Sequence, residues 1–478
     1  MTNPFQIDLS SWQAILFMVG TFLSSTLNAA LGWRDTLYSG LKEKLSALRE
    51  IHPLAEKTFS DRKILKARRY KADCDNLCNF SDTVTSGIET LFLVFGLSPF
   101  VTWAVFSAFP GIYPCIGLFL SFLAMSLVSN LYCVPFSYLE SFSLEARHGF
   151  NKMTRKTFFS DLAIEISVGT VMTFAIVCGY SLFLQRFCGP TLNGFLCLFG
   201  LLLATGPVLE FVHVHLVMPL FNKFEPLAEG TLRDKLESLM ERCGMKASSI
   251  VVMDSGKRSS HSNAFVHGMG RKKRIVLFDE ILKTHTEDEI VSIVAHEIGH
   301  AKLHHLALNW AILAVSEAAT AAIAVFLMND VSTYHAFGYR FVTPENIHSF
   351  RYVGYVLSMG LVGAVSWMLT PLFSWISREM EYWADAFSAR LCGKDHLRTA
   401  LIKLCSDNLS NVAPDPASEA WNYSHPSILP RLQAIGRILD PDEKWSMTAP
   451  KGKVKRKRRR RKTSSQTSRS GARGTVKK

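Results

Sequence analysis

The chain has 478 residues, of which 48% are hydrophobic and only 19% are charged. A soluble protein of this length would usually carry more charge, so the composition argues against an ordinary soluble protein. The formal net charge of +13 belongs to the end of the chain, because residues 451–478 hold 14 Lys and Arg and no acid. The remainder, with 39 basic and 40 acidic residues, is nearly neutral.

Seven long apolar runs predict transmembrane helices. Each run is close to or above the roughly 20 residues that a helix needs to cross the hydrocarbon core. Pro99 interrupts the second run, and Glu210 and His213 lie within the fifth. The runs are Trp12–Leu31, Ile88–Phe109, Cys115–Pro135, Leu162–Leu184, Leu196–Leu216, Leu306–Met328 and Val353–Ile376. We therefore expect an all-α polytopic membrane protein with about seven transmembrane helices.

The connections between these runs differ in their content of basic residues. The segment Gly32–Gly87 holds 11 Lys and Arg, whereas Met1–Ser11 holds none and Arg186 stands alone after the fourth run. Basic residues are enriched in cytosolic loops. We therefore expect Gly32–Gly87 to face the cytosol, together with the long polar segment Val217–His305.

Within that polar segment, Phe221–His305 is predicted to form a small α/β domain. Two short runs rich in β-branched residues, Ser249–Asp254 and Arg274–Phe278, indicate strands with a hairpin-like connection. A helix is predicted to begin at Thr286, because Glu289 follows three residues later and completes a capping box.

This helix carries the sequence His-Glu-Ile-Gly-His at residues 296–300. Imidazoles at i and i+4 share one helical face and can bind one ion. Glu297 lies between them and could take a proton from a water at that ion. The alternative is a surface helix that carries two histidines by chance. Because the apolar run Leu306–Met328 follows directly, a hydrolytic site here indicates a substrate attached to the membrane.

A hydrolytic zinc site needs three protein ligands and an open position. Glu381 is the best third candidate, since it lies on a helix predicted over Ser377–Arg390, which leaves the bilayer on the side of His296. Ala384 is small enough to let the two helices approach closely. Asp385, one turn after Glu381, could accept the free ring N–H of a histidine ligand. The alternative is that both acids are ordinary exposed helix residues.

Several other polar residues are candidate metal ligands, but each has an alternative interpretation. His304 could be a spare ligand, although a solvated residue at the interface is favoured. Glu210, His213 and His215 could form a second metal site, but we favour a polar lining near the helix end. Cys74, four residues before another cysteine on a predicted helix, is interpreted as a reduced thiol rather than a metal ligand.

Beyond the HExxH motif, several segments resemble the type I CAAX prenyl protease family of integral-membrane zinc endopeptidases, which are also called farnesylated-protein-converting enzyme 1. The resemblance runs from about residue 12 to residue 440. The matching segments are Pro135–Tyr138, Arg147–Asn151, Leu220–Phe224, Gly256–Ala264, Lys273–Asp279, Glu381–Asp385 and Tyr423–Pro426. The resemblance implies seven long helices around a large internal chamber, with one Zn²⁺ per chain at its cytosolic end.

The resemblance also implies roles for individual residues. The positions that match metal ligands are His296, His300 and Glu381. Glu297 matches the general base. Asp385 matches a position assigned as proton donor, but its spacing from Glu381 favours an orienting role. His425 matches a histidine that stabilises the oxyanion.

A substrate strand is implied as well. Asn263 and Ala264 match the edge strand that holds the substrate backbone by β-augmentation, and the same strand continues through Phe265 and His267. The substrate is expected to run antiparallel to it.

The sequence therefore predicts removal of the C-terminal tripeptide from prenylated CAAX proteins. The alternatives are a quality-control metalloprotease of broad specificity and a non-catalytic channel or scaffold with a structural zinc site. The expected location is the membrane of the endoplasmic reticulum or the inner nuclear membrane, with the active site opening to the cytosol.

Five segments follow from this assignment: a membrane region at 1–220, the zinc peptidase segment at 221–305, two transmembrane helices at 306–376, a helical segment completing the site at 377–450, and a disordered basic tail at 451–478. The tail is interpreted first as a ligand for anionic lipid or a sorting signal. A solvated tail is the alternative, and no nucleic-acid partner is expected.

Overall fold

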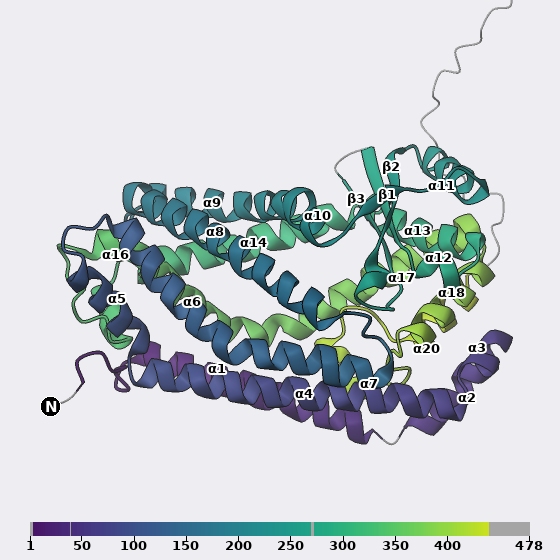
Figure 1. Ribbon diagram of the computed structural model, residues 1–478, viewed down its shortest axis with the longest axis horizontal. Coiled ribbons are helices and arrows are strands. Elements are labelled where there is room, and N and C mark those ends of the chain that lie inside the picture. The colour runs from purple at the N-terminus through teal and green to yellow at the C-terminus, as the bar shows by residue number, and fades with distance from the viewer. Residues whose placement is uncertain (1–2, 39, 269–271, 439–478) are drawn as a thin grey trace, which may run out of the picture. The chain divides into compact units, whose positions relative to one another are not determined.

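The computed structural model describes residues 3–38, 40–268 and 272–438. The basic tail and the calls made on it lie outside these residues. Long helices run along the molecule, and the strands gather with shorter helices at one end (Figure 1). The long helices are α1 (Trp12–Leu37), α4 (Asp61–Val94), α6 (Pro114–Leu139), α8 (Arg155–Phe187), α9 (Leu192–Val212), α14 (His305–Leu327), α16 (Ile347–Ser366) and α17 (Thr370–Cys392).

Shorter elements connect these helices and build the polar end. They are α2 (Leu41–Ile51), α3 (Pro53–Thr58), α5 (Leu97–Ala108), α7 (Ala146–His148), α10 (Met218–Phe221), α11 (Thr231–Arg242), α12 (Ile281–Thr284), α13 (Glu287–Lys302), α15 (Val331–Ala336), α18 (Lys394–Asp407), α19 (Pro416–Asn422) and α20 (Ile428–Gly436). Two π-helical turns, η1 (Glu140–Glu145) and η2 (His213–Val217), and two 3₁₀ turns, η3 (Ser255–Lys257) and η4 (Trp367–Leu369), complete the helical elements.

The predicted set of membrane helices is confirmed in number. Among the described residues, six helical runs are long and apolar enough to span a membrane, and a bent pair makes a seventh. That pair, α4 and α5, meets at 55°. The helix there begins at Asp61, well before the predicted start at Ile88. The large internal chamber stays a prediction.

The break in this span lies at Gly96 and not at the predicted Pro99. Gly96 has φ +69°, in the left-handed region, and a Cβ there would lie 1.8 Å from the carbonyl oxygen of Phe5. Pro99 instead falls in the first turn of α5, where its missing N–H costs no helical hydrogen bond. The glycine therefore ends one helix, and the proline is accommodated in the next.

The last membrane run is longer than predicted. The sequence predicts a seventh span that ends at Ile376 and a helix over Ser377–Arg390 directly after it. Instead α16, η4 and α17 follow one another without interruption from Ile347 to Cys392. Glu381 is thus placed by the same helical run that crosses the membrane. The fifth span likewise continues through η2 into α10 and ends at Phe221.

In the described part of the chain, four strands form one sheet in the order β1-β2-β4-β3. They are β1 (Phe224–Pro226), β2 (Lys246–Met253), β3 (Ala264–His267) and β4 (Lys272–Phe278). The predicted hairpin between β2 and β4 is wrong, because these two strands are parallel. The chain leaving β2 first returns as β3, which pairs antiparallel with β4. As a result β3 is an edge strand.

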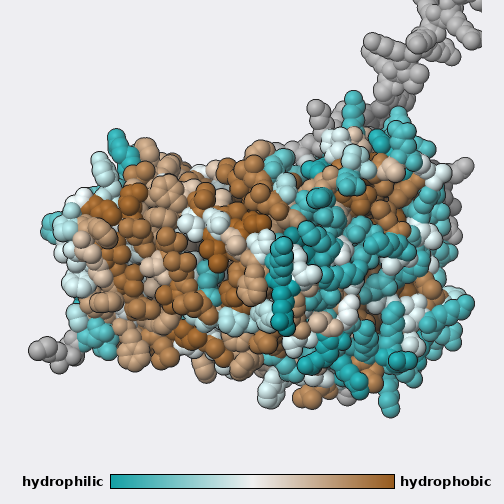
Figure 2. Space-filling model, in the orientation of Figure 1, coloured by the Kyte–Doolittle hydropathy of each residue, from teal (hydrophilic) through white to brown (hydrophobic). Residues whose placement is uncertain are grey.

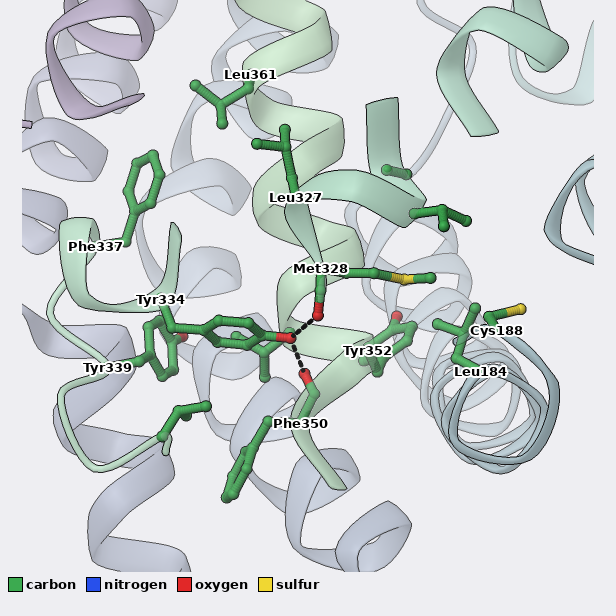
Figure 3. Close-up of a cluster of buried hydrophobic side chains, with 14 of the residues drawn as sticks. Leu184, Cys188, Leu327, Met328, Tyr334, Phe337, Tyr339, Phe350, Tyr352 and Leu361 are labelled. Carbon is green, nitrogen blue, oxygen red and sulfur yellow. Dashed lines mark hydrogen bonds between the residues drawn. The ribbon is translucent and has the colours of Figure 1, made fainter. Parts of the chain in front are cut away.

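Hydrophobic and hydrophilic residues separate along the molecule. Figure 2 shows hydrophobic residues gathered over the half that contains α6, α8 and α9, and hydrophilic residues over the end that carries the sheet and α11. Far from the sheet, a buried cluster surrounds Tyr334, whose hydroxyl lies 2.8 Å from the carbonyl oxygen of Met328 and 3.3 Å from that of Phe350 (Figure 3). This packing fixes the end of the helices opposite the sheet.

At the polar end, α13 and α17 cross at very short range. A Cβ on Gly299 would lie 3.2 Å from the Cα of Ala384 and 3.3 Å from the Cβ of Phe387. The expected close approach at Ala384 is therefore present, and it depends equally on a glycine in the facing helix. This crossing brings the HExxH helix against the helix that carries Glu381.

A bulkier side chain at this crossing should separate the two helices. We expect Gly299→Val to destabilise the protein by about 1–3 kcal/mol through overpacking and to lower its zinc content. Gly363→Val is the matched control, because a Cβ at Gly363 meets nothing within 4 Å. Thermal unfolding in detergent and metal analysis of both variants test this expectation, and equal values for the two variants contradict it.

Candidate metal centre

The helix that carries the two histidines is fixed at its start. Thr286 caps α13, and the side chain of Glu289 bonds back to the Thr286 N–H at 2.8 Å, so the predicted capping box is present. Lys403 of α18 donates to the same Glu289 carboxylate at 2.7 Å. Most of the helix is buried, including His296. Its register relative to neighbouring helices is therefore well determined.

Three side chains meet with their donor atoms facing one another. His296 Nε2 lies 3.2 Å from His300 Nε2 and 3.3 Å from Glu381 Oε2, and His300 Nε2 lies 3.2 Å from Glu381 Oε1. Ligands about 2.0–2.1 Å from a tetrahedral ion would lie roughly 3.3–3.4 Å apart. Two imidazoles and a carboxylate are also a donor set that zinc prefers. The residues fit a single ion.

Asp385 lies behind His296, on the side away from these donors. Its Oδ1 is 2.9 Å from His296 Nδ1, so it can hold the ring with Nε2 free for an ion. This position agrees with the orienting role expected for Asp385, and both that role and the proton-donor role stay predictions.

Arg431 of α20 neutralises the buried acids. Its guanidinium donates to both oxygens of Asp385 at 2.8 and 2.7 Å, and Nη2 lies 3.5 Å from Glu381 Oε2. The three side chains are nearly inaccessible, with relative exposures of 13% for Arg431, 5% for Glu381 and 1% for Asp385. Removing one partner from such a buried ion pair typically costs about 3–5 kcal/mol.

A second imidazole supports His300. Nδ1 of His305, a buried residue, lies 2.9 Å from Nδ1 of His300. When His300 uses Nε2 for a metal, its Nδ1–H can donate to His305. The neighbouring His304, considered as a spare ligand, is exposed with φ 58° and lies outside the cluster, as the favoured interpretation expected.

The remaining predicted catalytic residues lie at the same centre or on its helix. His425, which is 65% exposed, has Nδ1 3.0 Å from Glu381 Oε2. Glu297 follows His296 on α13 and is half-buried. The structure thus brings His425 to the metal ligands from a segment more than 120 residues further along the chain than the HExxH motif.

The predicted substrate strand lies at the edge of the sheet and packs against α13. It contains Ala264, Phe265 and His267, while Asn263 precedes it and its carbonyl accepts from Phe278 N–H at 3.1 Å. Among the described residues, no strand pairs with the edge of β3 that faces away from β4. At its far end, His267 Nδ1 lies 3.6 Å from Glu210 Oε1.

The polar cluster of the fifth span does not form a second metal group among the described residues. His215 stacks on Phe211, with ring centroids 4.4 Å apart, and lies 5.9 Å from the ring of His267. Glu210 and His213 are exposed. The favoured interpretation, a polar lining near the helix end, agrees with these positions.

Sequence reasoning missed two residues of this centre. Arg431 follows His425 by six residues and is a lone cation in an apolar stretch. This pattern is the feature of the sequence that could have identified it. The partnership of His305 with His300 was not predictable, because it depends on a helix break at His304, whose backbone is left-handed.

A bundle of membrane helices, with an HExxH helix at its polar end and a carboxylate placed as the third ligand, defines a membrane-bound metallopeptidase. The sequence matches the profile of peptidase family M48 over residues 226–439 and that of the CAAX prenyl protease N-terminal region, five membrane helices, over residues 43–223.

Individual relatives agree with these profiles. A CAAX prenyl protease 1 homolog of Arabidopsis thaliana is 33% identical over 79% of this chain and 88% of its own length. CAAX prenyl protease 1 of Saccharomyces cerevisiae is 30% identical over 83% and 91%, respectively. The crystal structure of S. mikatae Ste24p superposes with a TM-score of 0.77 at 27% identity, covering 89% of this chain and 99% of that one. The chain belongs to the CAAX prenyl protease 1 family of M48 metallopeptidases.

The geometry predicts how metal affinity depends on pH. Burial lowers the pKa of His296, but the adjacent carboxylates of Asp385 and Glu381 outweigh it and raise the pKa from 6.5 to about 9 in the metal-free protein. The stabilisation from this proton is present below pH 6.5 and is lost as the pH rises through about 9. Because zinc must displace the proton, its apparent affinity should rise about tenfold per pH unit across this window. Competition with a fluorescent chelator measures the slope, and a flat profile contradicts it.

Proposed function

We propose that the protein hydrolyses the peptide bond after the isoprenylated cysteine of CAAX proteins and releases the C-terminal tripeptide. The observation that carries the proposal is the meeting of His296, His300 and Glu381 at the polar end of a membrane-spanning helical body. A peptidase centre at the polar end of membrane-spanning helices suits a substrate that is anchored by a lipid. Each buried methylene of such a lipid contributes about 0.8 kcal/mol to membrane association.

The two histidines and Glu381 would hold one Zn²⁺. When bound, the ion polarises the scissile carbonyl and makes water a stronger acid. Asp385 orients His296, and His305 accepts from His300, so that both rings present Nε2. Arg431 keeps the two buried carboxylates ionised and in place.

The remaining residues handle protons and charge. Glu297 takes a proton from the attacking water and returns it to the leaving amine of the tripeptide. His425 donates a hydrogen bond to the oxygen on which negative charge develops. The backbone from Asn263 through Phe265 to His267 aligns the substrate as an added antiparallel strand. The protein lies in the membrane of the endoplasmic reticulum or in the inner nuclear membrane. Its site faces the cytosol, and the excess of basic residues in the loops on that side supports this orientation.

A matched pair of peptides tests the activity. Purified protein is expected to cleave a farnesylated CAAX peptide and to leave the unprenylated peptide of identical sequence nearly intact. A chelator should abolish cleavage, and zinc should restore it. Equal cleavage of both peptides indicates instead a protease of broad specificity, and no cleavage of either contradicts the proposal.

Loss of the proposed base should separate chemistry from metal binding. We expect Glu297→Gln to keep its zinc, since the three ligands are unchanged, and to lose detectable turnover of the farnesylated peptide. Metal analysis and a fluorescence assay on the same preparation measure both quantities. Near-normal turnover would remove Glu297 from the proposed mechanism.

The role of His425 is tested in the same way. His425→Ala should fold and bind zinc but lose roughly two orders of magnitude in kcat, because one donor to the oxyanion is removed. If the zinc content falls together with the rate, His425 is a metal ligand and does not act on the oxyanion.

A further inference from the structure

The direction of the edge strand β3 determines where the substrate residues before and after the scissile bond lie. This argument rests on the proposed function, in which the substrate lies antiparallel to β3. The substrate's residues before the bond then extend toward His267, and those after the bond extend toward Asn263 and Ser262. The two ends of β3 can therefore be compared as candidate subsites.

The His267 end lies beside the membrane helices. Glu210, at the end of α9, lies 3.6 Å from His267, and His215 of η2 lies 5.9 Å from it, ring to ring. Both residues belong to the spanning run Leu192–Phe221. The lipid-bearing cysteine, which precedes the scissile bond, would thus extend toward the membrane region.

The other end of β3 is fixed by Asn408, at the C-terminal end of α18. Its side-chain oxygen accepts from Ser262 N–H at 3.1 Å, and its amide donates to the Ser262 carbonyl at 3.1 Å. The same oxygen lies 3.2 Å from Nδ1 of His261. The backbone just before the edge strand is therefore attached to the helix that follows α17.

Asn408 also lines a cavity of about 580 Å³, which reaches the metal centre. Its lining includes His425 and Arg431, both of which contact Glu381. The volume lies within the roughly 300–1,000 Å³ typical of small-molecule sites. One cavity thus extends from the side chains that contact Glu381 to Asn408, which holds the backbone just before β3.

The lining of this cavity has the chemistry of the departing segment. Leu401, Leu404 and Cys405 supply an apolar wall, suited to two aliphatic side chains. Lys71 of α4 also belongs to the lining, where it is paired with Asp75, and the lining itself holds no Asp or Glu. An apolar wall with no anion in the lining suits a short aliphatic peptide that ends in a free carboxylate.

We propose that this cavity between α4, α18 and the segment around His425 binds the three residues after the scissile bond and holds the tripeptide product. Residue size at these positions is then selected here, whereas isoprenoid length is selected at the His267 end. The two selections are independent because they lie on opposite sides of the bond.

Two cysteines of α4 supply a probe and its matched control. Cys74 lines the cavity, whereas Cys78, one helical turn further on, does not belong to the lining. In the wild-type protein, the tripeptide Val-Ile-Met at saturating concentration should slow modification of Cys74 by a methanethiosulfonate reagent and leave Cys78 unaffected. Peptide mapping by mass spectrometry reads both sites, and it requires no turnover.

Filling the cavity should change selectivity. We expect Cys74→Phe to lower kcat/KM for a farnesylated peptide ending in Val-Ile-Met by about tenfold relative to one ending in Ala-Ala-Ser, as steric exclusion of this size does in other pockets. Cys78→Phe should leave that ratio unchanged. Neither variant should alter the ratio between farnesylated and geranylgeranylated peptides.

The outcomes separate this inference from the proposed function. If the wild-type protein cleaves the farnesylated peptide, yet Val-Ile-Met does not protect Cys74 and Cys74→Phe keeps wild-type selectivity, the cavity is not the product site and the activity stands. If the wild-type protein cleaves neither peptide, the proposed function itself is wrong. Should Cys74→Phe fail to fold, protection of Cys74 in the wild-type protein decides the question.

Discussion

The structure depends on a group of buried charges where α13 meets α17. Glu381 and Asp385 lie side by side in a region almost closed to water, and two carboxylates in such a place repel one another unless cations compensate them. Arg431 supplies one positive charge from α20. The histidines in contact with these carboxylates, His296 among them, and a bound metal ion would supply the remaining compensation. The centre is thus both the catalytic site of the proposed reaction and a junction between three helices.

The same junction is held from outside by the N-terminal part of the chain. Asp35, buried at the end of α1, accepts hydrogen bonds from Asn411 at 3.1 Å, from the N–H of Asp415 at 2.7 Å and from the hydroxyl of Tyr423 at 3.1 Å. These contacts attach the segment that carries His425 to the first membrane helix. A residue proposed to act in catalysis therefore depends on packing between parts of the chain that are nearly 400 residues apart.

Much of this arrangement was predictable from local patterns. Apolar length identified the membrane runs, the capping box placed the start of α13, and the HExxH spacing gave two donors on one helical face. The order of the strands was not predictable, because parallel pairing of β2 and β4 depends on how the intervening chain is held. Arg258 anchors that chain by two hydrogen bonds to Asp161 of α8, at 2.8 and 2.9 Å. The bend at Gly96 was missed because the proline nearby is a stronger helix breaker in sequence patterns.

The sequence by itself determined the membrane character, the paired histidines and, through a resemblance spread over many segments, the proposed third ligand Glu381. These features are encoded in short periodicities and fixed spacings, which the chain carries in any conformation. Only the tertiary structure showed that Asp385 lies 2.9 Å from His296 Nδ1, that Arg431 and His305 contact the centre, and that one cavity is lined by both His425 and Asn408. Each of these is a contact between segments far apart in the chain or across a helix break, and such contacts depend on long-range packing, which no local pattern specifies.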